Sequence, residues 1–428
     1  MATSNNIISL RRHDLDNLRT FLTSLVTVHH TSITYSGTGA WPFKSAIFAD
    51  KSALILGFNM FNQSFFMGLF FWISGRVSAQ SLEKSPHIGG FIRIKIMRLG
   101  VPTLLYTLVV TPLVRFMVLS SWDADYVRTF LQHYYTTLRS VRGPIWYTAT
   151  LLSFDIIAAC IRKASGSTEK KAVNSNRGII YEQLKRYGWL AVAVCSFLSK
   201  AYFPFGTMLP IIGIQPTYAF QYIYAYTLGY LSQSYGDQTM KGAFDPSPTP
   251  VKVRGTKDEK IHEVQTSSGL SLPIAVVISL LSINLIFLPR YLDSVDWLRE
   301  TMAQLFGGWT MPSLLYVFWN EFSFHLVGPA LMSYFQQWYN KPTILSTWNA
   351  RYSYAAFLVH EPLSVVMEIL VEKALLPVLA TDFWMKSQIW QNIGPAVMTV
   401  SVGLTSAWAS SFAGKKLLEW IPSLKKII

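Results

Sequence analysis

Charged residues are scarce in this chain of 428 residues: they make up 14% of it, against about 25% in an average soluble domain. Hydrophobic residues account for 51%. This composition excludes two or three soluble domains and favours many membrane helices. Only two cysteines are present, and both lie in apolar stretches, which excludes a disulfide framework.

The signatures of several soluble chemistries are missing as well. The sequence contains no P-loop, no GxSxG motif, no HExxH motif and no cysteine and histidine spacing typical of metal ligands. We therefore expect no metal site and no bound cofactor. The net charge of +14 would suit nucleic acid, but the basic residues are dispersed among hydrophobic spans, and membrane topology explains them better.

Hydropathy predicts an all-α, polytopic membrane protein with about ten transmembrane helices in one bundle. The expected spans are residues 15–35, 58–77, 99–119, 144–161, 187–203, 218–234, 270–289, 311–332, 351–371 and 392–413. Residues 1–428 are expected to form one membrane domain. Two polar stretches within it, about 162–186 and 235–269, are predicted to be mobile cytosolic loops, because they have little to bury.

The predicted orientation places both termini in the cytosol. Lysine and arginine are more frequent in the connections that this orientation leaves inside, and an even number of spans returns the chain to the side where it began. The first apolar stretch follows a polar segment without a short hydrophobic region and cleavage site, so we expect a retained span and not a signal peptide.

The first expected span carries a polar stripe. At 100° per residue, Asp16, His30 and four threonines lie close to one line along the helix, with Arg19 beside them. A charge at the middle of a membrane helix costs about 2.5–3.5 kcal/mol, so a stripe that persists indicates a wet or reactive interior. His30 shares the stripe, whereas His29 points elsewhere. His30 is thus a candidate general base, and the alternative is that both imidazoles only form hydrogen bonds at the membrane interface.

Asp16 and Arg19 lie one turn apart near the start of this span. Asp16 precedes His30 by 14 residues, which is about 21 Å along a helix, so it cannot orient the imidazole directly. The two charges either pair with each other and anchor the helix, or contact a substrate.

Arginines gather near the cytosolic boundary between the second and third spans. Arg76 ends the stretch FFWISGR, and Arg93 and Arg98 lie in FIRIKIMRLGVP. Guanidinium groups suit phosphates, including those of a nucleotide-bearing acyl donor. The positive-inside rule and lipid headgroups offer the alternative explanation.

Two late spans contain ionisable residues near the middle of the membrane. His360 and Glu361 stand before Pro362, which bends a helix, and they form either a functional site or a structural pair. In the eighth span, Glu321 would either orient a histidine on another helix or serve packing.

The fourth span opens with GPIWY, which contains Trp146 and Tyr147. These two aromatic residues either contact substrate or belong to an aromatic belt at the membrane surface.

Together these motifs resemble the acyltransferase 3 family of integral membrane acyltransferases. The shared elements are an arginine (Arg11 or Arg12) before Leu-Asp-x-Leu-Arg at 15–19, and His30 fifteen residues after the leucine. FFWISG, FIRIKIMRLGVP, GPIWY and SYAAFLVHEPL follow in the family's order along nearly the whole chain. One departure is Asn17, where the family often has glycine. The stretch HHTSITYSG is closer to the glucan-succinylating branch and to fungal relatives.

The resemblance implies a membrane-bound O-acyltransferase that moves an acyl group, most simply acetyl, from acyl-CoA as co-substrate to a hydroxyl of a small, lipophilic secondary metabolite. From the residues and the resemblance together we expect catalytic roles for four residues: His30, Glu321, His360 and Glu361. We expect donor-binding roles for four arginines: Arg19, Arg76, Arg93 and Arg98. We expect structural or substrate contacts for three further residues: Asp16, Trp146 and Tyr147.

The expected partners are acyl-CoA, a hydroxylated acceptor and membrane lipid, without nucleic acid or an obligate protein partner. If the chain is fungal, the endoplasmic reticulum is its expected membrane. The competing hypothesis is a proton-coupled transporter of a small molecule, in which the polar stripe conducts protons.

Overall fold

The computed structural model describes most of the chain. The described residues are 12–48, 52–119, 122–164, 172–203, 206–239, 270–287, 304–343, 349–379 and 387–426. They are almost entirely helical, and their extended backbone contributes only an isolated bridge between Ser140 and Ile211. The prediction of an all-α membrane protein is confirmed.

Helices follow one another along the described chain. In order, they are α1 (His13–Thr34), α2 (Ala53–Lys84), α3 (Ile88–Lys95), α4 (Val101–Leu105), α5 (Thr111–Met117), α6 (Ala124–Thr136), α7 (Trp146–Ala164), α8 (Ala172–Tyr202), α9 (Pro216–Thr239), α10 (Leu272–Phe287), α12 (Met311–Trp338), α13 (Ala350–Leu370), α14 (Leu376–Leu379) and α16 (Gln388–Trp420). The π-helical turns η1 (Ile96–Gly100) and η2 (Tyr106–Val110) join α3, α4 and α5 into one stretch, and η4 (Val371–Leu375) joins α13 to α14. Each of the ten expected spans falls on one of these helices or stretches.

Four helical stretches among the described residues are long and apolar enough to cross a membrane. They are Ala53–Lys84, Ile88–Met117, Ala350–Leu375 and Ile389–Trp420. The number of about ten spans therefore stays a prediction. Helix α1 has 22 residues but is not one of the four, because its hydroxyl and charged groups lower its hydropathy.

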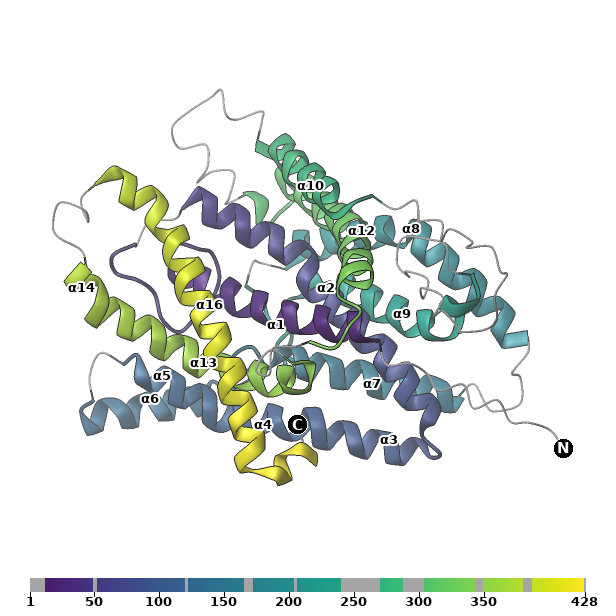
Figure 1. Cartoon of the computed structure of the whole chain (residues 1–428), viewed down its shortest axis with the longest axis horizontal. Helices are drawn as coiled ribbons and strands as arrows, with labels where there is room; N and C mark the ends of the chain where they lie inside the picture. The colour runs from purple at the N-terminus through teal and green to yellow at the C-terminus, as the bar shows by residue number, and fades with distance from the viewer. Residues whose placement is uncertain are drawn as a thin grey trace, which may run out of the picture.

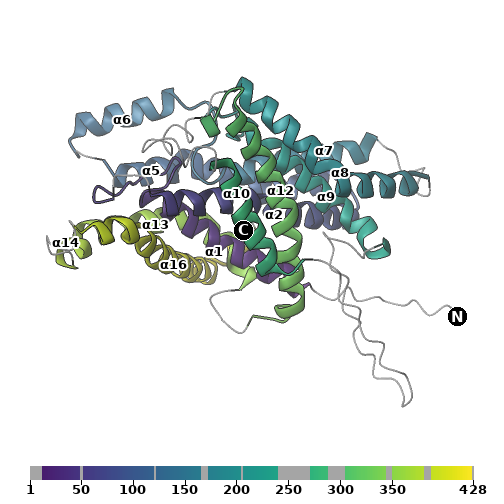
Figure 2. The same ribbon diagram turned by 90° about the horizontal axis from the view of Figure 1, so that it is seen from above.

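Helix α1 lies at the centre of the bundle. It packs against α2 and α12 on one side and against α13 and α16 on the other (Figures 1 and 2). Leu18 and Leu22 are fully buried, and most of the stripe's threonines are buried too. The threonines of the polar stripe are thus enclosed by protein, whereas the side chains of Asp16 and Arg19 are partly exposed.

Helices α2 and α9 approach closely because glycines lie at their crossing. A Cβ atom added at Gly75 would meet the carbonyl oxygen of Tyr226, and one added at Gly229 would meet the carbonyl oxygen of Trp72. Small residues of this kind let membrane helices bring their backbones together.

The two predicted loops have different boundaries in the structure. Helix α8 begins at Ala172, so the second half of 162–186 is helical, while residues 165–171 lie outside the described part. Tyr181, which lies within this predicted loop, is fully buried in the main core. The second loop is described only as far as Thr239, the last residue of α9.

We predict that Gly229→Ala destabilises the protein, because the added methyl group would collide with the backbone of α2. Overpacking of this kind costs about 1–3 kcal/mol, which lowers the unfolding temperature measured in detergent by several degrees. Gly57→Ala is the matched control, because a Cβ atom there has no neighbour within 4 Å. Equal melting of the two variants would contradict the close approach.

Candidate active site

Three aromatic rings stack near the C-terminal end of α1. The ring centroid of His30 lies 4.4 Å from that of Trp41, and the two planes differ by 13°. The centroid of the His30 ring also lies 5.4 Å from that of the His360 ring, and these two planes differ by 24°. Trp41 belongs to the loop after α1 and His360 to α13. His30 therefore faces the interior of the bundle and not lipid.

The hydrogen bonds of these histidines leave nitrogen atoms available. Nδ1 of His360 contacts the carbonyl oxygen of Phe357. Because a carbonyl only accepts, this Nδ1 carries the proton, and Nε2 of the neutral ring is an acceptor. Nε2 of His360 and Nδ1 of His30 are both buried, and neither has a hydrogen-bond partner among the described residues. Two imidazoles from different helices thus offer unused nitrogens at one place.

His29 faces a different helix. Its ring lies 4.9 Å from Phe66 of α2 and 6.0 Å from the ring of His30. Helical periodicity predicts that the two histidines lie on different sides of α1, and their rings do contact different helices. His29 is nevertheless buried, because α2 covers that side.

Two glutamates that the sequence argument passed over fix the loop around Trp41. The Nε1 atom of Trp41 donates to Glu368 Oε2 at 2.9 Å, and both side chains are buried. One turn later, Glu372 accepts from the Ser45 hydroxyl and from the backbone N–H of Ala46, each at 2.8 Å. These bonds hold the tryptophan against His30.

A sequence signal for Glu368 existed. It lies seven residues after Glu361, and residues seven apart lie on nearly the same face of a helix. A second carboxylate within a predicted apolar span is unusual enough to be noted. Its partner Trp41 could not be named, since nothing local connects the two residues.

Glu361 is tied to a different part of the fold. Its Oε2 accepts from the Tyr106 hydroxyl at 2.8 Å, and both side chains are buried. A Cβ atom at Gly143, which has a φ of +82°, would come within 2.9 Å of the same oxygen. Glu361 thus joins α13 to η2 and to the GPIWY segment, which favours the structural reading of this residue.

Glu321 belongs to a second buried polar cluster. Its carboxylate accepts from Gln221 at 3.3 Å and from Asn320 at 3.0 Å. Gln221 also donates to the carbonyl oxygen of Ser64, so the cluster joins α12, α9 and α2. Among the hydrogen bonds of Glu321 in the described residues, none involves a histidine. No described contact therefore supports the expected role of Glu321 in orienting a histidine.

The N-terminal half of α1 holds the predicted pair of charges. Arg19 Nη2 lies 3.3 Å from Asp16 Oδ1 and 3.3 Å from the carbonyl oxygen of Ala350, the first residue of α13. The two charges pair with each other and link α1 to α13. This contact corresponds to the anchoring role, the first of the two roles considered from the sequence.

Trp146 and Tyr147 both pack within the bundle. The Tyr147 hydroxyl lies 2.6 Å from Ser74 Oγ, and its ring centroid lies 5.9 Å from that of Phe357. Trp146 stacks on Tyr222 with centroids 5.5 Å apart. These contacts place both residues among other helices and not in a belt at the surface.

A row of rings leads along α13 to the stacked histidines. Tyr354 and Phe357 stack with centroids 6.4 Å apart, and Phe357 lies 5.3 Å from His360. At the start of the row, the Tyr354 hydroxyl donates to the carbonyl oxygen of Arg98 at 2.8 Å. The arginine stretch and His30 thus lie at the two ends of one aromatic row.

The predicted donor arginines have different surroundings. Arg76 is buried, and its Nη1 donates to the carbonyl and hydroxyl oxygens of Ser232 on α9, each at 3.2 Å. Arg93 and Arg98 are exposed. The exposed pair is open to a large anion, whereas Arg76 serves the packing of α2 on α9.

A buried ion pair near these arginines was not predicted. Lys95 Nζ lies 2.8 Å from Asp155 Oδ2 and donates to Ser78, while the Tyr226 hydroxyl donates to Asp155 Oδ1 at 2.7 Å. Asp155 is the only acidic residue of the predicted span 144–161. An isolated carboxylate in an apolar span indicates a buried partner, and this was the sequence signal for the ion pair.

Three threonine hydroxyls of the polar stripe donate to their own helix, whereas Thr34 donates to the carbonyl oxygen of Phe43 in the following loop. Thr20 donates to the carbonyl oxygen of Asp16 at 3.0 Å, Thr23 to that of Arg19 at 2.9 Å and Thr27 to that of Thr23 at 3.2 Å. A hydroxyl has one proton, so these groups are not free donors for a developing oxyanion.

The comparisons with known proteins give a match at the family level. The family model Acyl_transf_3, described as an acyltransferase domain, matches residues 12–412. No curated protein and no solved structure matches the chain. The matched range contains the stacked histidines, the Asp16–Arg19 pair and the exposed arginines.

We predict that Tyr106→Phe destabilises the protein, because it leaves the buried carboxylate of Glu361 without its described donor. Loss of one partner of a buried polar pair costs about 1–3 kcal/mol. Tyr135→Phe is the control, since the Tyr135 hydroxyl bonds to a backbone carbonyl at an exposed position. Unfolding in detergent, followed by tryptophan fluorescence, should separate the two, and identical curves would show that Glu361 has another source of stabilisation.

Proposed function

The chain belongs to the acyltransferase 3 family, and from this premise we propose that it is an O-acyltransferase of the fungal secondary-metabolism branch. In this proposal it moves an acetyl group from acetyl-CoA to a hydroxyl of a small, lipophilic metabolite. The single observation that carries the proposal is the stack of His30 and His360, which presents unpartnered imidazole nitrogens inside a membrane protein.

In the proposed reaction His30 takes the proton from the acceptor hydroxyl. The hydroxyl oxygen attacks the thioester carbonyl, the new C–O bond forms, and the C–S bond breaks. The thiolate of CoA leaves and takes up the proton. His360 lies beside His30, with Nε2 as an acceptor that would share the proton during the exchange. Direct transfer is the simpler route, and an acyl-histidine intermediate is its alternative.

The donor would approach from the exposed arginines. Arg93 and Arg98 would bind the phosphates of CoA, whose negative charges suit guanidinium groups. The thioester arm would then lie along the row of Tyr354 and Phe357 toward His360, a path of about 9 Å for six residues of α13. The charge pattern supports a cytosolic position of these arginines and of both termini, and a fungal protein of this kind would lie in the endoplasmic reticulum.

The deciding experiment uses protein purified in detergent, without a sealed compartment. It is given acetyl-CoA and a panel of hydroxylated lipophilic acceptors, and CoA release and acetylated products are measured. A transferase turns over under these conditions, whereas a proton-coupled transporter cannot move substrate across a boundary that is absent. Flux in sealed vesicles combined with no turnover in detergent would favour the transporter.

We expect His30→Ala to lower kcat by about 10²–10⁴-fold, since this is the usual contribution of a general base. His29→Ala is the matched control and should lose far less activity, because its ring packs against Phe66 and not against His360. The two variants must melt at similar temperatures for the comparison to count. Equal losses from two well-folded variants would remove the basis for choosing His30.

We expect Arg98→Ala to raise the KM for acetyl-CoA about 5-fold or more with little change in the KM for the acceptor. The estimate corresponds to one lost hydrogen bond of about 1 kcal/mol. Arg128→Ala, at an exposed position on α6, removes the same charge from the other end of the α3–α5 stretch and controls for net charge. An unchanged donor KM in Arg98→Ala would leave topology as the explanation of this arginine.

A further inference from the structure

The loop after α1 turns back along the end of its own helix. Carbonyl groups in the last turn of a helix have no partner within the helix, and this loop supplies donors to two of them. Lys44 Nζ donates to the carbonyl oxygen of Ile33 at 2.7 Å. The backbone N–H of Ser45 donates to that of Thr34 at 3.1 Å. Trp41 lies between the helix end and these bonds, so the loop brings it back beside α1.

The turn of this loop depends on Gly39. Its φ is +133°, a conformation that other residues rarely adopt, and a Cβ atom there would lie 2.8 Å from the Ile33 side chain. The chain therefore turns tightly against α1 two residues before Trp41. The indole then packs in one apolar cluster with Ile33, Val114 and Val365, which belong to α1, α5 and α13. Three helices thus surround the indole.

The indole lies beside both imidazoles of the candidate site. Its plane differs by 13° from that of His30 and by 27° from that of His360. The centroids of Trp41 and His360 are 6.4 Å apart, a distance too short for His30 to lie between them as the middle ring of a stack. The three rings therefore form a triangle, in which one indole lies beside two histidines from different helices.

One hydrogen bond fixes the orientation of the indole. An indole has a single N–H group, and in Trp41 it donates to Glu368 Oε2 at 2.9 Å. Both side chains are buried. Glu368 belongs to α13 and follows His360 by eight residues. The bond therefore joins the ring that covers His30 to the helix that carries His360.

The face of an indole suits the charge that the proposed reaction creates. His30 becomes an imidazolium when it takes the proton from the acceptor hydroxyl. An indole face attracts a cation that lies within about 6 Å of its centroid, and the attraction is strongest where water is excluded. The ring centroid of Trp41 lies 4.4 Å from that of His30 in a buried site. The attraction arises only as the proton moves, so it lowers the barrier without tightening the binding of either substrate.

We propose that Glu368 is a positioning residue of the acyl transfer, an inference that rests on the proposed function. The residue acts through Trp41. Its carboxylate holds the indole, and the indole holds the imidazole of His30 in the orientation in which it accepts the proton and stabilises the imidazolium. The alternative is a purely structural bond that fastens the loop to α13.

Two substitutions of Glu368 separate positioning from charge. Glu368→Gln keeps an oxygen that accepts from the indole, whereas Glu368→Leu has none. We expect Glu368→Leu to lower kcat about 10-fold with an unchanged KM for acetyl-CoA, as loss of a buried cation–π contact would give. Glu368→Gln should restore most of kcat. Equal losses in the two variants would assign the effect to the negative charge and overturn the positioning role.

A double variant tests whether Glu368 acts through Trp41. Trp41→Phe keeps an aromatic ring but removes the N–H, so it should lower kcat about as much as Glu368→Leu does. Because the two residues share one bond, the variant with both substitutions should lose no more than either single variant. Losses that add would show that the two residues act independently, which would overturn the inference.

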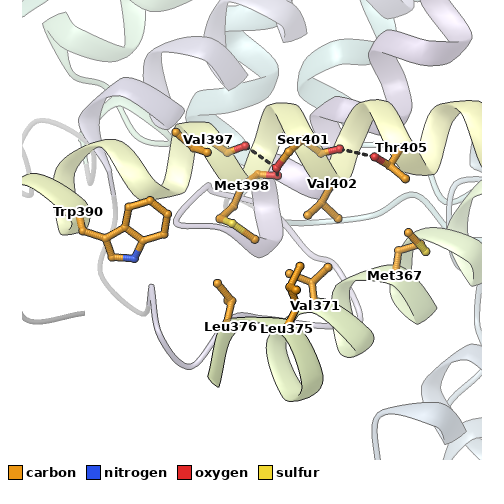
Figure 3. Close-up of a pocket in the computed structure, with 10 residues that line it drawn as sticks. All are labelled: Met367, Val371, Leu375, Leu376, Trp390, Val397, Met398, Ser401, Val402 and Thr405. Atoms are coloured by element: carbon orange, nitrogen blue, oxygen red, sulfur yellow. Dashed lines mark hydrogen bonds between the residues drawn. The ribbon is translucent and has the colours of Figure 1, made fainter. Parts of the chain in front are cut away.

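Trp390→Phe is the matched control for Trp41→Phe. The indole nitrogen of Trp390 is also buried, but it has no hydrogen-bond partner among the described residues. Figure 3 shows Trp390 at the opposite end of an apolar pocket from Met367, the residue before Glu368. This variant makes the same chemical change away from the histidines and should keep its kcat. A loss equal to that of Trp41→Phe would point to general loosening of the fold and contradict the inference.

NMR of the protein in detergent, with isotope-labelled histidine, tests the geometry without turnover. An aromatic ring moves the resonance of a proton above its face upfield. The signal of the His30 ring, identified by its loss in His30→Ala, should move downfield in Glu368→Leu and stay in place in Glu368→Gln and Trp390→Phe. An unmoved signal in a folded Glu368→Leu variant would overturn the inference.

The two kinds of measurement fail separately. Turnover that persists unchanged in Glu368→Leu refutes the positioning role and leaves the proposed reaction intact. Absence of turnover in the unmodified protein refutes the proposed function, and a shifted histidine signal in Glu368→Leu would then still establish that Glu368 orients the ring.

Discussion

The enclosure of α1 by α2, α12, α13 and α16 is the constraint on which the rest of the structure depends. A helix that carries Asp16, Arg19 and two histidines is unfavourable in contact with lipid, because each charged or polar group needs a partner there. Helices α2 and α13 supply polar and aromatic partners for α1. A backbone carbonyl oxygen of α13 accepts from Arg19, and the His360 ring, also on α13, stacks on the ring of His30. The stacked histidines therefore lie where the bundle encloses a helix that carries charged and polar side chains.

Local patterns predicted much of this arrangement. Hydropathy located all ten expected spans on helices, because the apolar character of a span is contained in its own residues. The Asp16–Arg19 pair was expected for the same reason, since the two residues are one turn apart. The separation of His29 from His30 followed from helical periodicity, and the rings do face different helices.

Partners that are distant in sequence could not be read in this way. Trp41 and Glu368 are 327 residues apart, and only the packing of α13 on α1 brings them together. Arg76 looked like a member of one arginine cluster, yet its guanidinium binds Ser232 across the close crossing of α2 and α9. Lys95 and Asp155 likewise meet because α3 packs against α7. The direction of a long side chain depends on the neighbouring helix, which the span itself does not specify.

The fastening of the 41–47 loop to α13 has a consequence for how this part of the protein opens. Glu368 and Glu372 hold this loop through an indole, a hydroxyl and backbone amides. Moving the loop away from α13 would leave two carboxylates without their hydrogen-bond donors in surroundings of low polarity, which is unfavourable. The loop and the end of α13 should therefore open together as one cooperative unit, and their backbone amides should exchange hydrogen for deuterium at a common rate.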